Sequence, residues 1–509
     1  MFAKLFIRNN MKFKSVLVKP YAKYMHRKMH ATSKNAIKDQ HKIRENLIAE
    51  AVSTQFGQEH HFAKINSYED FKKHIPIRDY EALVPYIEKI LEGQEDVLWK
   101  GKPLYFAKTS GTTSGAKYIP ITKDSISNHI DGAKHALLYY MAETGNTEFT
   151  DGKMIFLSGS PTLVEEGGIP TGRLSGIVNH HIPGYLKTNQ LPSYETNCIE
   201  DWEEKLSKVI QETEHEDMTL ISGIPPWIQM YFDWLQQKYP GKTIKDIFPN
   251  LSLIVYGGVN FEPYKAKLFQ SIGGPIDTVE TFPASEGFFA FQDKQNDTSL
   301  LLNTNSGIFF EFIPLDEINN EKPTRLCLEE VEVGVNYAMI INSNAGLWGY
   351  NLGDTIKFTE LNPYRLLVTG RIKHFISAFG EHVISEEVEN AMSEAIEKCP
   401  AVVREFTVAP KVKTDGDELP HHEWFIEFQE LPDDLESFAL ALDNALRKRN
   451  EYYDDLVGGG ILSLLKVRPL QAKAFQNYMK EVGRLGGQNK APRLSNDRKV
   501  ADVLEKFTL

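Results

Sequence analysis

Two spacings of apolar residues alternate in the first half of the chain, and they predict alternating strands and helices. Apolar side chains recur at helical spacing over residues 201–214, which begin with a capping-box pattern, and over residues 225–238, which open on two prolines. Short apolar runs that are typical of buried strands lie at residues 104–107, 154–157, 220–221 and 251–256. This alternation favours an α/β sheet.

The pattern changes in the second half of the chain. From about Leu300 to Val368 it becomes strand-rich, and beyond Gly370-Arg371 it predicts a shorter α+β segment. The strands are expected at residues 308–313, 337–341, near Phe406 and at 424–428, and the helices at 385–398 and 435–450. We therefore predict an α/β fold with two domains. Residues 1–370 form a large N-terminal domain of several subdomains, with α/β sheets and a β-rich part, and residues 371–509 form a smaller, mobile α+β C-terminal domain.

Composition narrows the class of protein. The 509 residues are 41% hydrophobic and 25% charged, which is ordinary for a globular protein, and no apolar run approaches the ~20 residues of a membrane span. A net charge of -12 argues against nucleic acid as the main partner, because no basic excess neutralises phosphates. The three cysteines are far apart and form no Cys-x-x-Cys pair, so we expect a cytoplasmic protein without a disulfide framework or a zinc ribbon.

The N-terminal segment has an unusual charge distribution. Its first acidic residue is Asp39, whereas lysine and arginine are frequent before it. Such a bias resembles a transit peptide or a segment that binds a membrane surface. A basic surface helix packed on an acidic body is the simpler alternative, and a secretory signal is not expected because a continuous apolar core is missing.

The strongest local motif is the segment from Thr109 to Lys117. Five hydroxyl residues, two glycines and a terminal lysine follow an apolar strand. Glycine allows backbone N–H groups to converge on an anion, and the hydroxyls and the ammonium add further donors. The spacing is not that of a Walker A loop, because only three residues separate Gly111 from Gly115. We expect a phosphate-binding loop rather than a flexible surface turn.

Two further clusters lie at predicted strand ends. Thr281–Gly287 contains an aromatic ring, a hydroxyl and a carboxylate within five residues, and these could meet a base, a phosphate and its magnesium ion. Taken alone, an exposed Ser-Glu turn explains this segment more simply. The glycine pair after Tyr256 would permit the close approach of a flat ligand.

The last motifs follow in the C-terminal third. Asp354, after a glycine turn in Trp348–Asp354, is suited to accept hydrogen bonds from the two hydroxyls of a ribose, although a β-hairpin turn would have the same sequence. Gly370-Arg371 precedes the predicted domain boundary. The loop Gly486–Arg493 presents Lys490.

The order of these motifs resembles that of the acyl-adenylate-forming superfamily of acyl-CoA synthetases, luciferases and adenylation domains. The Ser-Gly-Thr-Thr-Ser-Gly loop, the Ala-Ser-Glu-Gly turn and the Gly-Gly-Gln-Asn-Lys-x-Pro-Arg ending resemble the plant auxin-responsive family of acyl acid–amido synthetases and its bacterial relatives. The resemblance extends from about residue 40 to the C-terminus.

The resemblance implies ATP and Mg²⁺ as cofactors and assigns roles to individual residues. Lys490 would act on the reacting carboxylate and the α-phosphate, Glu286 would hold phosphate and Mg²⁺, and Arg371 would contact the ribose or a phosphate. The residues implied to bind ATP are Ser110, Thr112, Thr113, Lys117, Gly258, Phe282, Ser285 and Asp354. Two positions depart from the superfamily pattern: Pro283 stands where glycine is common, and Asn351 stands where arginine is usual.

The function that the resemblance implies is adenylation of a small carboxylic acid and transfer of the acyl group to an amine, an amino acid. The sequence leaves the oligomeric state open, and a monomer is our default expectation. An acyl-CoA ligase is an alternative, although the chain lacks the Pro-x-x-x-x-Gly-Lys ending of those enzymes. A non-catalytic nucleotide-binding protein of the same fold is another alternative. The presence of Lys117, Glu286, Asp354 and Lys490 argues against it.

Two other sequence features are not expected to form sites. His180-His181 and His421-His422 are adjacent pairs, and neighbouring side chains of a strand point to opposite faces, so neither pair is expected to chelate a metal. The aromatic stretch Trp227–Trp234 is expected to be mostly core, and one edge of it could line an acyl pocket.

Overall fold

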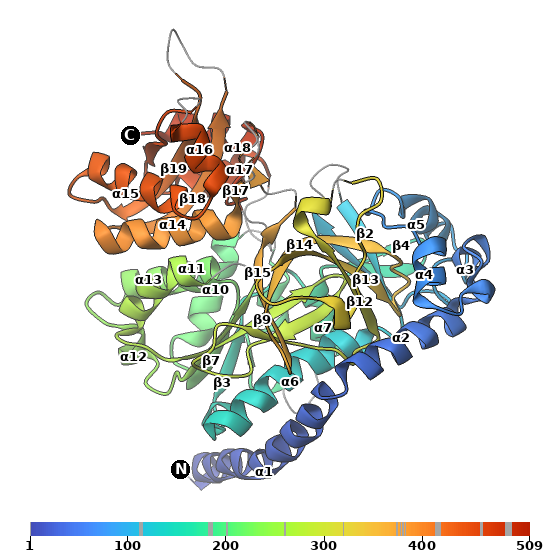
Figure 1. The fold of residues 1–509 in the computed structure, drawn as a ribbon. Coiled ribbons are helices and arrows are strands. Elements are labelled where there is room, and N and C mark those ends of the chain that lie inside the picture. The colour runs from blue at the N-terminus through green and yellow to red at the C-terminus, as the bar shows by residue number, and fades with distance from the viewer. Residues whose placement is uncertain are drawn as a thin grey trace. The chain divides into compact units, whose positions relative to one another are not determined.

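The structure, a computed structural model, forms two compact units (Figure 1). The larger comprises residues 1–259, 269–352 and 356–368, and the smaller comprises residues 260–268, 353–355 and 369–509. The domain boundary at residues 370/371 stays a prediction. The residues described are 2–110, 116–181, 187–199, 202–258, 261–318, 320–372, 375–376, 378, 381, 383–412, 419–458, 462–483 and 491–509.

An 11-stranded mixed sheet organises the larger unit. Strands β6, β3, β7, β8 and β9 are parallel neighbours, and β9, β10, β11 and β15 are antiparallel neighbours. In spatial order the strands are β12 (Ile308–Pro314), β13 (Asn336–Ser343), β14 (Tyr350–Leu361), β15 (Tyr364–Arg371), β11 (Leu300–Leu302), β10 (Gly287–Phe291), β9 (Asp277–Ala284), β8 (Leu253–Gly257), β7 (Met218–Ser222), β3 (Lys153–Phe156) and β6 (Gln190–Leu191).

Helices alternate with the parallel strands, as the sequence predicts. The helix α11 (Pro225–Lys238) has the predicted bounds because proline is tolerated only in the first turn of a helix, and the helix expected at residues 201–214 is α10 (Trp202–Thr213). In α11, Trp227, Tyr231 and Phe232 are buried, which confirms that this stretch is mostly core. The other helices of this part of the chain are α7 (Leu174–His180), α9 (Tyr194–Asn197), α12 (Ile244–Ile247) and α13 (Glu262–Ile272).

A smaller sheet has the strand order β2-β1-β5-β4, in which β1 and β5 are parallel and the other pairs are antiparallel. Its strands are β1 (Tyr105–Ser110), β2 (Ala116–Ile121), β5 (Ile169–Gly172) and β4 (Val164–Glu166). The helix α6 (Ile126–Thr144) packs closely on β10. A Cβ atom at Gly132 would lie 2.3 Å from Cγ of Phe288, so only glycine permits this approach.

The N-terminal helix α1 (Phe2–Ser33) lies beside α6 (Figure 1). Ala22 is fully buried, and the ring centroids of His26 and Tyr139 lie 4.6 Å apart. The segment is therefore a helix packed on the larger unit, which is the simpler of the two interpretations of its sequence. None of the described helices has the length and apolarity that crossing a bilayer requires.

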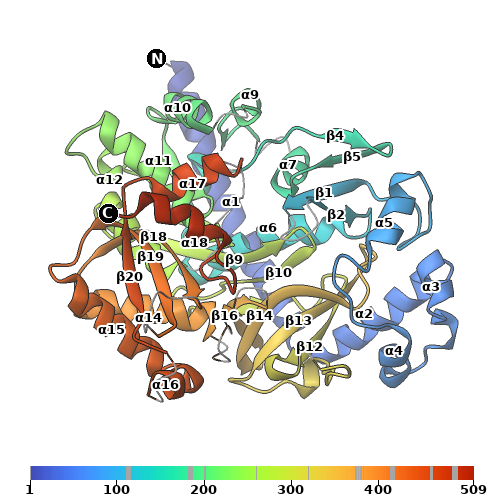
Figure 2. The same ribbon diagram turned by 90° about the horizontal axis from the view of Figure 1, so that it is seen from above.

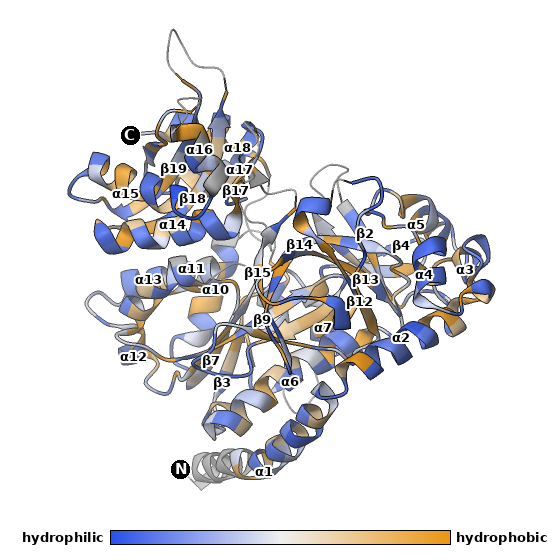
Figure 3. Ribbon diagram, in the orientation of Figure 1, coloured by the Kyte–Doolittle hydropathy of each residue, from blue (hydrophilic) through white to orange (hydrophobic). Residues whose placement is uncertain are grey.

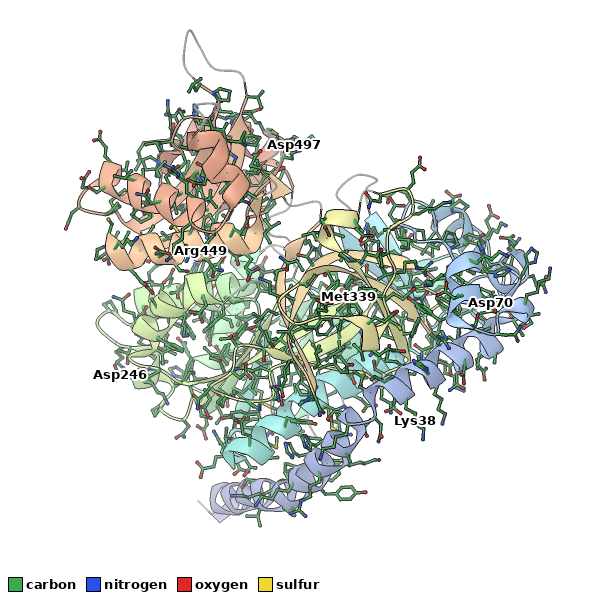
Figure 4. All side chains as sticks on the ribbon, in the orientation of Figure 1. Lys38, Asp70, Asp246, Met339, Arg449 and Asp497 are labelled. Atoms are coloured by element: carbon green, nitrogen blue, oxygen red, sulfur yellow. The ribbon has the colours of Figure 1, made fainter. Side chains whose placement is uncertain are left out.

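The core of the larger unit lies along strands β12 and β13, which carry the orange of hydrophobic residues in Figure 3. Met339 on β13 is fully buried, whereas Lys38 and Asp246 lie on exposed helices (Figure 4). Gln40 fixes α2 to the edge strand, since its amide nitrogen donates to Ile308 O (2.9 Å) and its oxygen accepts from Phe310 N (2.9 Å). The remaining helices before β1 are α2 (Ala36–Ala51), α3 (Gln55–Glu59), α4 (Tyr68–His74) and α5 (Val84–Leu91).

The smaller unit is α+β (Figure 2). Its three-stranded sheet consists of β18 (Val402–Lys411), β19 (His421–Glu430) and β20 (Lys466–Leu470), and a separate pair consists of β16 (Phe375–Ile376) and β17 (Val383–Ile384). The helices are α14 (Ser385–Lys398), α15 (Leu435–Arg447), α16 (Glu451–Gly458), α17 (Ala474–Glu481) and α18 (Lys499–Leu504). The predicted fold class is confirmed. The prediction of one helix to Asn450 is wrong, because a new helix begins at Glu451.

Candidate active site

The motif predicted to bind phosphate spans a β-hairpin. Thr109 lies on β1 opposite Lys117 on β2, and Ser110 lies opposite Ala116, so the expectation of a loop over the whole segment is wrong. The two strands pair as far as Ser110 and Ala116. Residues 111–115, with Thr112 and Thr113, and the side chain of Ser110 lie outside the described part of the structure.

Lys117 lies on the described side of this hairpin. Its Nζ is 5.3 Å from the centroid of the Tyr80 ring, a cation–π distance. The Tyr80 hydroxyl accepts a hydrogen bond from Tyr118 N (2.7 Å), which fixes the ring beside the strand. The ammonium group of Lys117 is thus held next to the glycine-rich turn by an aromatic residue that the sequence interpretation missed.

The segment with Ser285 and Glu286 forms the turn between two strands. Ala284 on β9 lies opposite Gly287 on β10, so Ser285 and Glu286 are the two residues of a tight turn. The Tyr350 hydroxyl donates to Glu286 Oε1 over 3.0 Å. Tyr350 is 1% exposed and begins the segment that ends at Asp354. Two motifs that are 64 residues apart in sequence therefore meet at this turn.

The residues before this turn pack closely. Phe282 is 8% exposed, and its ring meets that of Phe289 edge-on at 5.2 Å, so it is part of the core as well as a candidate neighbour of a base. A Cβ atom at Gly257 would lie 2.4 Å from Thr281 O, so this glycine permits β8 and β9 to approach. Gly258 is exposed with a φ of 78°, a backbone conformation that favours glycine.

Asp354 and Arg371 form a pair in the smaller unit. Arg371 Nε lies 2.6 Å from Asp354 Oδ1, and the two side chains are 53% and 6% exposed, respectively. Asp354 lies within β14 rather than in a turn, and Gly353 before it has a φ of 84°. The carboxylate is thus buried and oriented by an arginine whose side chain stays accessible. The structure brings together two residues to which the resemblance assigns ribose and phosphate contacts.

Lys490 lies outside the described residues, but the chain directly after it is firmly anchored. Arg493 has a side chain that is 11% exposed and forms ion pairs with Glu405 and with Glu389 (3.4 Å), and these carboxylates raise its pKa. Val408 N donates to Arg493 O (2.9 Å), and Thr407 Oγ1 donates to Pro492 O (2.7 Å). The end of the lysine loop is therefore tied to β18.

The adjacent histidines have structural partners. His422 Nε2 lies 2.8 Å from Glu381 Oε1, and both side chains are fully buried, while His180 Nε2 lies 3.1 Å from Pro161 O. Within the described ranges, no group of three or more histidine, cysteine, aspartate and glutamate residues could hold a metal ion.

Comparison with known proteins identifies the family. The GH3 family N-terminal domain matches residues 25–207, the GH3 family central domain matches residues 301–371, and the GH3 family C-terminal domain matches residues 386–499. The matches include the hairpin of Lys117, the segment with Asp354 and Arg371, and Lys490.

Characterised relatives and a solved structure agree with this assignment. Jasmonoyl–L-amino acid synthetase JAR4 of Nicotiana attenuata is 24% identical over 394 residues, which cover 64% of this chain and 67% of the relative. The 4-substituted benzoates–glutamate ligase GH3.12 of Arabidopsis thaliana is 22% identical over 553 residues, which cover 91% and 94%. A structure of the AtGH3.15 acyl acid amido synthetase in complex with 2,4-DB superposes with a TM-score of 0.79 at 15% identity, over 95% of this chain and 96% of that one. The relatives named are acid–amino acid ligases, and the chain belongs to the GH3 family.

Proposed function

We propose that this protein uses ATP to adenylate a carboxylic acid and passes the acyl group to an amino acid, releasing AMP and pyrophosphate. The observation that carries the proposal is the hydrogen bond from Tyr350 to Glu286. It joins the Ser-Glu turn to the segment of Asp354, and the resemblance to adenylate-forming enzymes assigns both to ATP.

The chemistry requires that like charges be brought together. A carboxylate is a poor acyl donor because oxide is a poor leaving group, whereas AMP leaves readily from a mixed anhydride. The acid and the α-phosphate are both anionic, so Lys117, Lys490 and the N–H groups of the hairpin turn would stabilise the charge that develops between them. Asp354 would accept the ribose hydroxyls and Arg371 would contact ribose or phosphate. Ser110, Thr112 and Thr113 would hold the phosphates, with Gly258 and Phe282 beside the base.

Magnesium fits the donor set at the turn. Mg²⁺ is commonly held by one or two carboxylates together with substrate phosphates. Glu286 presents such a carboxylate, with Ser285 beside it, and needs no second acidic residue nearby. Bound there, the ion would neutralise phosphate charge as a Lewis acid.

The acid is best sought by experiment, because the relatives' names and the 2,4-DB complex point to different acids. The test is ATP–pyrophosphate exchange with a panel of aryl, indolyl and fatty acids. We expect exchange with one class of acid, and we expect Glu286→Ala and Lys490→Ala to lower the rate about 100-fold or more. The variants Glu321→Ala and Lys499→Ala, each at an exposed residue of the same type, are the matched controls and should keep the wild-type exchange rate.

The product then decides the second half-reaction. Mass spectrometry of the product formed with amino acids and with coenzyme A distinguishes an amide from a thioester. Exchange with none of the acids, in a preparation that binds ATP, would contradict the proposal and favour a nucleotide-binding protein without ligase activity.

We also propose that the enzyme works in the cytoplasm as a monomer. Cys198, Cys327 and Cys399 are all free thiols, which suits a reducing compartment. Cell fractionation tests the cytoplasmic location, and the molecular mass measured in solution tests the monomer.

A further inference from the structure

A buried lysine in the larger unit has no charged partner. Lys205 on α10 is 4% exposed, and its Nζ donates to two backbone carbonyls, Ser158 O (3.0 Å) and Asn197 O (2.8 Å). An ammonium group has three N–H donors. In the described part of the chain no carboxylate pairs with it. Burial lowers the pKa of Lys205 to about 8, so the fold holds this charge at a cost.

A second cation lies close to the first. Arg173, between β5 and α7, lies over the backbone of Gly159: a Cβ atom added there would be 2.5 Å from Arg173 Cδ. Burial lowers the pKa of Arg173, and the charge of Arg173 contributes to lowering the pKa of Lys205. Among the described residues Arg173 has no ion-pair partner. A buried lysine beside a partly buried arginine, without an anion, is rare in proteins, because each charge disfavours the other and both are at least partly desolvated.

A small cavity lies beside the lysine. Leu206, Val209, Asn197 and Lys205 are among the residues around it, and the surface that they present to it is apolar. Its volume of about 10 Å³ leaves room for about one water-sized group. Asn197 is 1% exposed, and its Oδ1 has no hydrogen-bond partner in the described structure. This oxygen is an acceptor, so a group that satisfies it must be an N–H or O–H donor rather than a carboxylate.

The position of this cluster relates it to the candidate active site. Ser158 follows β3, Gly258 follows β8 and Ser285 follows β9, and the carboxyl ends of parallel strands share one edge of a sheet. Strand β3 is two positions from β8 and three from β9, or roughly 10 and 15 Å at about 4.8 Å per strand. These separations are within the length of a small substrate.

We infer that Lys205 and Arg173 bind a substrate carboxylate that is not the one adenylated. This inference rests on the proposed function and extends it. The carboxylate has two possible sources: the α-carboxylate of the amino acid acceptor, or the second carboxylate of a dicarboxylic acyl acid. Either would supply the missing anion and would occupy the third N–H donor of Lys205.

The test compares substrates that differ only in charge. Lys205→Gln keeps N–H donors for the two carbonyls but removes the charge, Arg173→Gln removes the second charge, and Lys208→Gln changes an exposed lysine of the same helix as a control. One arm measures amide formation with L-alanine, L-leucine and L-aspartate, each against its own α-carboxamide. The other measures pyrophosphate exchange with hexanoate against adipate.

We expect the kcat/KM preference for the carboxylate to fall about 10- to 100-fold in Lys205→Gln and Arg173→Gln, and to stay constant in Lys208→Gln. A fall of this preference in the first arm identifies the bound group as the α-carboxylate of the amino acid acceptor. A fall in the second arm identifies it as the second carboxylate of a dicarboxylic acid. Equal losses with charged and uncharged substrates would mean that Lys205 only supports the fold, and unchanged preferences would also overturn the inference.

A measurement without turnover separates this inference from the proposed function. The probes are acetate and acetamide, and the readout is the Tm of the full chain. Acetate should raise the Tm of the wild-type protein and of Lys208→Gln more than acetamide does, and this difference should vanish in Lys205→Gln. The same difference in all three proteins would overturn the inference even if pyrophosphate exchange occurs. Absence of exchange together with the expected Tm shifts would contradict only the proposed function.

Discussion

Removal of a single oxygen atom tests the contact on which the proposed function depends. Tyr350→Phe deletes the hydroxyl that donates to Glu286 Oε1 and leaves the ring in place. Because Tyr350 is 1% exposed, the space left by the hydroxyl is closed to bulk solvent, and water cannot readily replace the donor. The side chain of Glu286 then loses a group that orients it, although it keeps its charge. The affinity for Mg²⁺ in the presence of ATP should therefore decrease.

The size of the effect follows from the type of hydrogen bond. A bond to a charged group contributes about 1.5–3 kcal/mol, and each 1.4 kcal/mol is about a factor of ten in an equilibrium constant. If all of it is expressed in metal binding, the Mg²⁺ concentration for half-maximal exchange rises about 10- to 100-fold. Because no carbon atom is lost, the core packing terms of a truncation do not arise, and the free energy of unfolding should fall by no more than the ~1.5–3 kcal/mol of the hydrogen bond itself.

The assay is ATP–pyrophosphate exchange as a function of Mg²⁺ concentration at saturating acid. Tyr337→Phe is the matched control, since Tyr337 is also 1% exposed and its hydroxyl accepts a hydrogen bond from Glu332 N (2.9 Å) elsewhere in the same sheet. Tyr337→Phe should leave the Mg²⁺ dependence unchanged. An unchanged Mg²⁺ dependence in Tyr350→Phe, with Glu286→Ala still inactive, would refute the orienting role of the tyrosine.

Two further predictions concern a buried ion pair and the buried lysine. Arg325 Nη2 lies 2.7 Å from Glu311 Oε2, with side chains 7% and 0% exposed, so Arg325→Met should lower the free energy of unfolding by about 3–5 kcal/mol. The double variant Arg325→Met/Glu311→Gln should lose less free energy of unfolding than the two single variants lose in sum. Denaturant unfolding measures all three, and strictly additive losses would contradict this. With its pKa lowered to about 8, Lys205 loses its proton as the pH rises through that value. Above that pH, the kcat/KM preference of the wild-type protein for an amino acid over its carboxamide should decline toward the preference of Lys205→Gln. A preference that stays constant from about one pH unit below that pKa to about one unit above it would contradict this.

Helix starts were predictable where one residue type limits the backbone. Pro225-Pro226 can only lie in the first turn of a helix, and α11 begins there. The end of α15 was not predictable from apolar spacing, because the three residues after Arg447 are polar and fit an exposed helical turn as well as a loop. Asn450 instead caps the next helix, since its Oδ1 accepts from Tyr453 N (2.8 Å), and this local hydrogen bond competes with helix continuation.

The strands that carry the candidate site were harder to predict. Thr281–Gly287 contains proline and glycine, which indicate a turn, yet β9 continues to Ala284 and the turn is only Ser285-Glu286. Pro283 is tolerated at the end of this strand, and the neighbouring strands supply the pairing that sequence periodicity does not show. The motif residues were found through resemblance. The Tyr350–Glu286 hydrogen bond depends on how β14 and the β9–β10 turn pack, and no local pattern contains that information.

Lys205 lies in a sequence pattern that the sequence interpretation missed. In α10 the buried side chains Leu206, Val209 and Thr213 recur at helical spacing, and Lys205 lies on the same stripe, whereas Lys208 lies on the exposed face. A lysine on the apolar face of a helix must find a partner, extend to solvent or bind a ligand. The residue is 4% exposed, so its side chain does not extend to solvent, and among the described residues its partners are two neutral carbonyls. A charged residue on the apolar stripe of a helix is therefore the sequence pattern that predicts Lys205 as a candidate ligand-binding residue. The remaining option, an anionic ligand, is the one that the substrate comparisons test.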